Sequence, residues 1–255
     1  MTLADQSRPL VSIIMPAYNA EQFIAQAIAS VQAQTLTDWE LIVSDDASTD
    51  ATFAIVQRIA KQDDRIVVLG PAGNNGPARA RNRAIEHATG RYIAFLDSDD
   101  LWKPGKLATQ IGFMQQNQVA FSFSSYDRLA EDGAFLGEHR VARAVNYRSL
   151  LKSCTIGCLT AIYDTHVFGK KFMPDVRGAE DFGLWLSLLK NIDKAYPVAD
   201  NLASYRVRTQ SLSSDKWKAA SYTWRIYREV ERLSLFRSAY YFLHYAYRGV
   251  VNSYF

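Results

Sequence analysis

Apolar runs and polar breaks alternate along the first hundred residues. Continuous apolar runs are typical of strands that are covered on both faces, and they occupy residues 11–15, 41–43, 66–69 and 92–96. Between these runs apolar residues recur at helical spacing, which predicts helices after Asn19, from about Thr49 and over 78–88. Strands separated by such helices predict an α/β fold, a Rossmann-like, mostly parallel central sheet with helices on both faces.

Two local signals refine the ends of these helices. Asn19 followed by Gln22 is typical of a capping box, and Gly90 is expected as the glycine that ends the third helix. After residue 100 the pattern is less regular. The elements expected there are helices over 104–116 and 180–190, strands over 119–124, 159–163 and 203–208, and a helical region beyond 213.

The composition fits one large domain, with or without an appendage. The chain has 255 residues, of which 48% are hydrophobic and 22% charged, enough to bury a sizeable core. We expect neither a signal peptide nor a membrane-spanning segment, and therefore a cytosolic protein. Cys154 and Cys158 are too few for a disulfide framework, and we interpret them as small buried side chains.

Positive charge and aromatic side chains collect in the last forty residues. Residues 216–255 hold seven Lys/Arg against two Glu, a charge of +5, so that the rest of the chain is near −2 for a total of +3. Ile226, Val230 and Leu233 form an apolar helical stripe beside basic residues. Such a helix could lie on an anionic membrane surface or pack on its own domain or a partner subunit. We expect no nucleic-acid binding, because no RNA- or DNA-binding signature accompanies the charge.

Polar clusters follow three of the predicted strands, at residues 16–19, 45–46 and 97–100. Open parallel sheets bind ligands outside the carboxyl ends of their strands. Oxygen ligands from several carboxylates favour a hard cation such as Mg²⁺ or Mn²⁺. The alternative is that aspartates simply prefer turns and helix caps.

A phosphoacceptor receiver domain would also use such acids, but it is about half this length. No GxGxxG or P-loop signature is present.

Seven segments, taken in order, resemble family 2 glycosyltransferases, which are inverting, nucleotide-sugar-dependent enzymes with the GT-A fold. The resemblance extends over residues 9–213 and is strongest to bacterial transferases that build O-antigens, capsules or teichuronic acid. The segments are VSIIMPAYN (11–19), SVQAQT (30–35), WELIVSDDASTD (39–50), NNGPARARNRAI (74–85), YIAFLDSDDLWKP (92–104), AEDFGLWLSL (179–188) and YRVRTQSLS (205–213).

The resemblance assigns donor-binding roles to residues of the first half. Pro16, Ala17 and Tyr18 would line the nucleotide pocket, and Asp46 would accept a hydrogen bond from the uracil N3–H. Arg81 would lie near the donor phosphates, where its fork can pair with phosphate oxygens.

The segment DSD at 97–99 matches the family's DxD motif. Asp99 would bind the Mn²⁺ or Mg²⁺ ion, while Asp97 and Ser98 would contact the nucleotide sugar, Asp97 by way of the ribose or a metal-bound water. We assign no catalytic task to Asp100. The metal would offset charge on the departing nucleoside diphosphate.

On the acceptor side, Asp181 matches the general base and Glu180 would orient it or an acceptor hydroxyl. Spacing alone favours a plainer interpretation, since acids at the start of a helix are stabilised by its dipole. Trp185 lies on the same helical face as Asp181 and is expected either to stack on a sugar or to belong to the core.

We therefore expect a GT-A domain over 1–213, with a nucleotide-sugar half (9–103) and an acceptor half (104–213), and a helical extension over 214–255. The expected donor is a UDP-sugar, and the expected acceptor is a saccharide on a polyprenyl diphosphate. The enzyme would then work in the cytoplasm or peripherally on the inner face of the membrane. The alternatives are an inactive sugar-binding or scaffold subunit and a sugar nucleotidyltransferase, whose glycine-rich N-terminal signature is missing.

Overall fold

The computed structural model describes residues 8–71, 73–208 and 216–254, with side chains described as far as Tyr247. The strands are β1 (Val11–Ala17), β2 (Trp39–Asp45), β3 (Ile66–Leu69), β4 (Tyr92–Phe95), β5 (Leu101–Trp102), β6 (Phe121–Leu129), β7 (Phe135–His139), β8 (Ile162–Asp164) and β9 (Tyr196–Arg206). The helices are α1 (Ile24–Gln32), α2 (Thr52–Ala60), α3 (Pro77–His87), α4 (Lys106–Gln116), α5 (Tyr147–Lys152), the short η2 (Cys158–Thr160), α6 (Thr165–Phe168), α7 (Glu180–Leu189), α8 (Lys216–Arg225), the π-helical η3 (Ile226–Val230) and α9 (Leu235–Tyr254).

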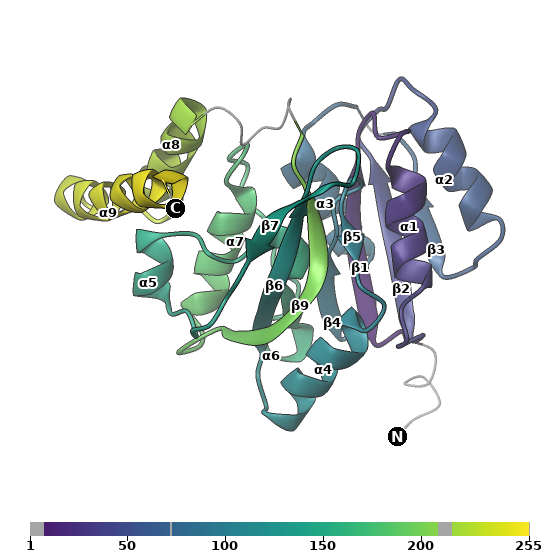
Figure 1. Ribbon diagram of the computed structural model, residues 1–255, viewed down its shortest axis with the longest axis horizontal. Coiled ribbons are helices and arrows are strands. Elements are labelled where there is room, and N and C mark those ends of the chain that lie inside the picture. Colours follow the sequence, from purple (N-terminus) through teal and green to yellow (C-terminus); the bar gives the residue numbers. More distant parts are fainter. Residues whose placement is uncertain (1–7, 72, 209–215, 255) are drawn as a thin grey trace.

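Within the described residues the strands form one nine-stranded sheet in the order β3-β2-β1-β4-β8-β6-β9-β5, with β7 beside β6 (Figure 1). The first four strands are parallel, as expected. The chain runs outward from β1 to β3 and then crosses back to place β4 on the other side of β1. This change of direction opens a crevice at the carboxyl ends of β1 and β4, where ligands of such sheets bind. The second half of the sheet is mixed, since β8 is antiparallel to both β4 and β6.

Each face of the sheet carries its own hydrophobic core, as alternation along the strands requires. In β1, Ile14 packs with α3, α5 and α7 on one face. Its neighbours Ile13 and Met15 pack with α1 and α4 on the other face. The prediction of helices on both faces is therefore confirmed.

Both predicted helix ends differ from the structure. No capping box forms at Asn19, because α1 begins at Ile24. Asn19 instead has a positive φ of 46°, and its side-chain oxygen accepts a hydrogen bond from Thr49 N at 2.9 Å. Gly90 does not end α3, which stops at His87. Gly90 is required for another reason: a Cβ there would lie 2.6 Å from Ser12 N in β1.

Gly90→Ala should therefore destabilise the protein. The added methyl group would meet β1 backbone atoms that cannot move without disturbing the sheet, so we expect a loss of about 2–3 kcal/mol or more in the free energy of unfolding. Gly112→Ala is the matched control, because a Cβ at that position in α4 meets nothing within 4 Å. It should gain about 0.5–1 kcal/mol. Urea denaturation of both variants checks this, and equal stabilities would contradict it.

The later elements are longer or shorter than their apolar patterns predict. Strand β6 extends to Leu129 and β9 begins at Tyr196, since these two strands pair with each other and each supplies the other's hydrogen bonds. The prediction that both cysteines are buried is wrong: Cys154 is exposed and Cys158 is half-buried.

The C-terminal helices pack on the acceptor half, at the end of the molecule opposite α2 (Figure 1). Ile226 is fully buried, and Val230 and Leu233 pack against the same core. This stripe therefore packs on its own domain, which is one of the expected alternatives. A membrane contact elsewhere in the extension 215–255 stays a prediction. Among the described residues, no helix is long and apolar enough to cross a membrane. The expected boundary at 213/214, and the motif segment beyond Arg208, lie outside the described residues.

Candidate active site

A cavity of about 630 Å³ opens at the carboxyl ends of β1, β2 and β4 and is closed on its far side by the start of α7. Of the residues singled out from the sequence, all but Trp185 line it. They are Pro16, Ala17, Tyr18, Asp46, Arg81, Asp97, Ser98, Asp99, Glu180 and Asp181. The fold thus brings the three predicted strand-end clusters and the ED pair into one space.

Asp46 organises the loop that leads into α3. Its two carboxylate oxygens accept hydrogen bonds from Asn75 N and Gly76 N, both at 2.8 Å. The contact with uracil stays a prediction, and the carboxylate keeps lone pairs for it. Asp45 has a structural role, because its Oδ2 accepts a hydrogen bond from Ser48 N at 3.0 Å.

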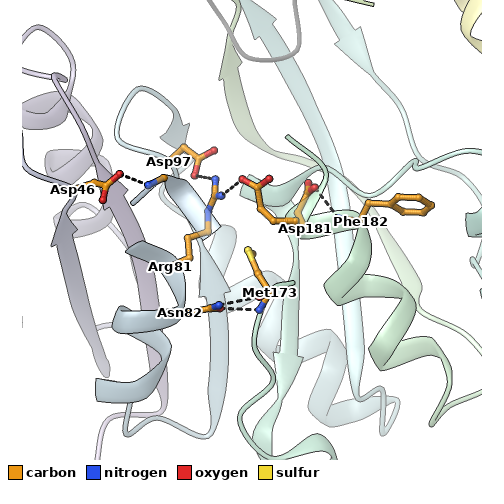
Figure 2. A network of polar contacts seen from close by, with 9 residues as sticks. Asp46, Arg81, Asn82, Asp97, Met173, Asp181 and Phe182 are labelled. Carbon is orange, nitrogen blue, oxygen red and sulfur yellow. Dashed lines mark hydrogen bonds and ion pairs between the residues drawn. The ribbon is translucent and has the colours of Figure 1, made fainter. Parts of the chain in front are cut away.

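Arg81 joins the two halves of the site (Figure 2). Its Nη2 lies 2.5 Å from Asp97 Oδ1 and its Nη1 lies 3.0 Å from Glu180 Oε1. The guanidinium is almost fully buried, and the adjacent Asn82 exchanges two hydrogen bonds with the backbone of Met173. Helix α3 therefore connects the DxD segment to the acceptor half. Because both terminal nitrogens already bind carboxylates, the contact of Arg81 with donor phosphates stays a prediction.

Negative charge is concentrated at Asp97, Asp99 and Asp100. Burial, followed by the charge of Asp97, raises the pKa of Asp99 above its usual value, and Arg208 at 3.4 Å partly offsets this. Asp100 is fully buried and its Oδ1 accepts a hydrogen bond from Arg206 N at 2.8 Å. Its burial raises its pKa well above normal. Asp100 therefore fixes the end of β9 beside the DxD segment, a structural role that the sequence did not reveal.

The chemistry of these groups suits a hard divalent cation. Asp97 and Asp99 offer only oxygen ligands, which Mg²⁺ and Mn²⁺ prefer, and closely spaced acids favour a cation between them. Among the described residues, however, no group of three or more His, Cys, Asp or Glu side chains could hold a metal alone. An ion here would need further ligands from water and from the phosphates of a nucleotide.

The position of Asp181 is compatible with the general-base role expected of it, which stays a prediction. It lines the cavity at the first turn of α7, and its Oδ1 accepts a hydrogen bond from Phe182 N at 2.7 Å. Burial, followed by the neighbouring charge of Glu180, raises the pKa of Asp181 to about 6. A carboxylate with such a pKa is ionised at neutral pH and more basic than an ordinary aspartate, as general-base catalysis requires.

Trp185 belongs to the core, so its proposed stacking on a sugar is wrong. It is fully buried, and its ring centroid lies 5.4 Å from that of Phe95 and 5.2 Å from that of Phe121. It follows Asp181 by one helical turn, but it lies deeper in the fold, under the sheet, where no ligand reaches it.

Several cationic residues of the cavity were not among those expected from the sequence. Arg177, Arg206 and Arg208 all line it, and guanidinium groups suit phosphate oxygens. For Arg206 and Arg208, the alternating arginines of the segment YRVR (205–208) were the available signal in the sequence. Only the position of β9 beside the DxD segment shows that these two arginines belong to the site.

Comparison with known proteins supports the resemblance to family 2 glycosyltransferases. A family described as "Glycosyl transferase family 2" matches residues 12–172. TuaG of Bacillus subtilis (strain 168), named for teichuronic acid biosynthesis, is 45% identical over 95% of this chain and 97% of its own. WfgD of Escherichia coli, named a UDP-Glc:alpha-D-GlcNAc-diphosphoundecaprenol beta-1,3-glucosyltransferase, is 40% identical over 94% of both chains.

Solved structures show the same fold. S. aureus TarS 1-349 in complex with UDP-GlcNAc matches with a TM-score of 0.70 and 21% identity, over 91% of this chain and 70% of that one. The mannosyltransferase PcManGT from Pyrobaculum calidifontis, in complex with GDP-Man and Mn²⁺, matches with a TM-score of 0.68 and 20% identity, over 89% of this chain and 65% of that one. The predicted GT-A fold is thereby confirmed.

Proposed function

The chain belongs to glycosyltransferase family 2, and from this premise we propose that it transfers one sugar from a UDP-sugar to a saccharide hydroxyl with inversion at the anomeric carbon. The observation that carries the proposal is the position of Asp181. This half-buried carboxylate, with a pKa of about 6, lines the same cavity as Asp97 and Asp99.

On the donor side, Pro16, Ala17 and Tyr18 form the wall for the nucleotide, and Asp46 offers an acceptor for the base. Asp99, with Asp97 beside it, would hold Mn²⁺ or Mg²⁺, and Ser98 would contact the sugar nucleotide. Bound there, the ion would offset the charge that builds on the leaving diphosphate. PcManGT carries Mn²⁺ in its complex with GDP-Man, which supports this choice of cofactor.

On the acceptor side, Asp181 removes the proton of the attacking hydroxyl, whose oxygen forms the new bond to C1 as the bond to the diphosphate oxygen breaks. One displacement of this kind inverts C1. Glu180 holds Arg81 at 3.0 Å, and Arg81 holds Asp97, so the base and the DxD segment keep a fixed spacing. Holding the reacting groups in a fixed geometry lowers the entropic part of the reaction barrier.

The names of relatives guide the choice of acceptor. WfgD and WfaP of Escherichia coli are named as acting on a sugar attached to diphosphoundecaprenol, and they are 40% and 39% identical to this chain. We accordingly propose a saccharide on a polyprenyl diphosphate as the acceptor, in the synthesis of a bacterial surface polysaccharide. The enzyme would then act peripherally at the inner face of the membrane.

A screen of UDP-sugars tests the proposal. Each UDP-sugar, beginning with UDP-glucose, is mixed with the protein with and without Mn²⁺, and its hydrolysis and the rise in Tm are measured. We expect one donor to raise Tm and to be hydrolysed slowly only when the metal is present. Stabilisation by a UDP-sugar without any turnover, even with a saccharide acceptor, would instead favour an inactive sugar-binding subunit.

Asp99→Asn should remove the dependence of UDP binding on metal. For the unchanged protein we expect Mn²⁺ to tighten UDP binding by about tenfold or more, because an ion held by Asp99 would offset the charge of the diphosphate. In the variant the two affinities should agree within about twofold. Calorimetric titration of UDP with and without Mn²⁺ measures this. If the variant keeps the full metal effect, Asp99 is not the ligand.

A further inference from the structure

A second cavity, of about 730 Å³, lies between α5 and α9, away from the active site. Its cationic lining comes from Arg148 and Lys152 of α5 and Arg237 of α9, and the rest is apolar or aromatic. Among the described residues that line it, none is a carboxylate. Glu231, which contacts Tyr147 at its edge, is already bonded to Lys190 Nζ at 2.8 Å. The cavity therefore suits an anion that brings apolar groups with it.

Helix α9 exposes an apolar stripe next to this cavity. Phe236, Tyr240, Leu243 and Tyr247 are 88%, 50%, 69% and 69% exposed. Their spacing of four, three and four residues places them on one face. The opposite face is occupied, since Tyr241 and Phe242 contact the rings of Tyr227 and Trp224. Phe236 and Tyr240 belong to both the stripe and the cavity wall, so the two features form one continuous surface.

We propose that this surface binds an anionic phospholipid membrane. Helix α9 lies in the interface with its stripe among the acyl chains, and a lipid phosphate enters the α5–α9 cavity between Arg148 and Arg237. Tyrosine suits the interface between lipid and water, because its ring is apolar and its hydroxyl group can stay hydrated. A basic, aromatic helix surface of this kind binds anionic bilayers in two ways: it buries apolar side chains among the lipids, and its cations attract the anionic headgroups.

The dimensions of the surface favour a membrane over a protein partner. The stripe runs about 17 Å along one helix, with four exposed side chains. A stable protein interface needs about 20–30 residues on each side. A bilayer demands no matching shape, and its phosphates complement Arg148, Lys152 and Arg237, beside which the described lining of the cavity places no carboxylate.

The position of the surface also suits the proposed lipid-linked acceptor, and to that extent the inference rests on the proposed function. Tyr241 of α9 contacts Tyr227, and Tyr227 contacts Phe182, with ring centroids 6.4 and 6.1 Å apart. Phe182 directly follows Asp181. Through Tyr227, the membrane-binding helix is therefore connected to the helix that carries the proposed base.

Co-sedimentation of the full chain with lipid vesicles tests the inference, without donor or acceptor. Vesicles of phosphatidylcholine alone are compared with vesicles that also contain phosphatidylglycerol. The stripe variant is Phe236→Ser with Leu243→Ser, and its control is Phe135→Ser with Leu136→Ser, an exposed pair on β7. The cavity variant is Arg148→Gln with Arg237→Gln. Its control is Arg58→Gln with Lys61→Gln, two exposed cations in and directly after α2, at the other end of the molecule.

We expect phosphatidylglycerol to strengthen binding at least tenfold, added salt to weaken it, and the stripe and cavity variants each to lose about tenfold or more. Both controls should bind as the unchanged protein does. Unchanged binding in either test variant overturns the inference. So does a dimer, seen by analytical ultracentrifugation without vesicles, that the stripe variant abolishes. Metal-dependent hydrolysis of the UDP-sugar without vesicles should be equal in all variants, so a failure of the proposed function would be seen separately.

Discussion

The Asp181→Asn variant is expected to lose sugar transfer by about 10³-fold in kcat, because it removes a general base from the reacting hydroxyl. Asparagine has the same shape, and its side-chain oxygen can still accept the hydrogen bond from Phe182 N. Affinity for UDP, measured by calorimetry, should therefore stay within about twofold. Transfer is measured with radiolabelled donor and saturating acceptor. A variant that keeps its turnover would remove Asp181 from the mechanism.

The same carboxylate should set the pH dependence of the unchanged enzyme. Burial raises the pKa of Asp181 to about 6, so kcat/KM should rise about tenfold per unit of pH below that value and level off above it. A raised pKa also means that the folded protein prefers the protonated acid, so stability falls as pH rises through about 6. Asparagine avoids this cost, and the variant should melt at the same or a higher Tm at pH 7.5.

A control separates the effect of this base from general loss of charge. Asp193→Asn removes an exposed acid, whose side chain is 82% accessible, just beyond the end of α7. It should leave kcat, Tm and the pH profile unchanged. A flat pH profile in the unchanged enzyme would contradict the assignment, even if Asp181→Asn were inactive.

Arg81→Ala should have the largest effect on stability. It leaves the buried acid Glu180 and the partly buried Asp97 without the cation that they share. Removing one partner from a buried ion pair costs about 3–5 kcal/mol. Arg81→Lys should recover part of this loss, but one ammonium group cannot repeat the fork that reaches both acids. Urea denaturation of the unchanged protein and of both variants measures these differences in the free energy of unfolding.

Arg79→Ala is the matched control for this prediction. Arg79 lies on the same helix and pairs with Asp175 at 2.9 Å, but both side chains are more than 60% exposed. Exposed pairs contribute about 0–1 kcal/mol. The two alanine variants differ in burial rather than in residue type. If they prove equally stable, Arg81 does not connect the two halves of the site as the geometry indicates.

The donor side was predictable because its signals are local. Continuous apolar runs located β1, β2 and β4, and each ends where a polar side chain interrupts the run. Residues 16–18, Asp46 and 97–99 therefore follow from the strands that precede them. Parallel strands then bring these ends to one edge of the sheet, whatever the details of the helices.

Contacts between distant segments were not predictable in the same way. Arg81 and Glu180 are 99 positions apart, and no spacing in the sequence marks them as partners. Helical spacing placed Trp185 on the face of Asp181, yet burial under the sheet decided its role. Asp100 lies just outside the DxD motif and received no catalytic task, but only the placement of β9 beside it showed that it accepts a hydrogen bond from Arg206 N.

The ion pairs of Arg81 also bear on the order in which the enzyme is assembled during synthesis. Asp97 follows Arg81 closely in the chain, while Glu180 emerges from the ribosome long after both. The nucleotide-binding half can thus fold with Arg81 paired to Asp97 alone. The pair with Glu180 forms only when α7 packs against this half. Contacts so distant in sequence form late in folding. The acceptor wall is the last part of the site to be completed, and a nascent chain stopped before α7 has Asp97 but not the base.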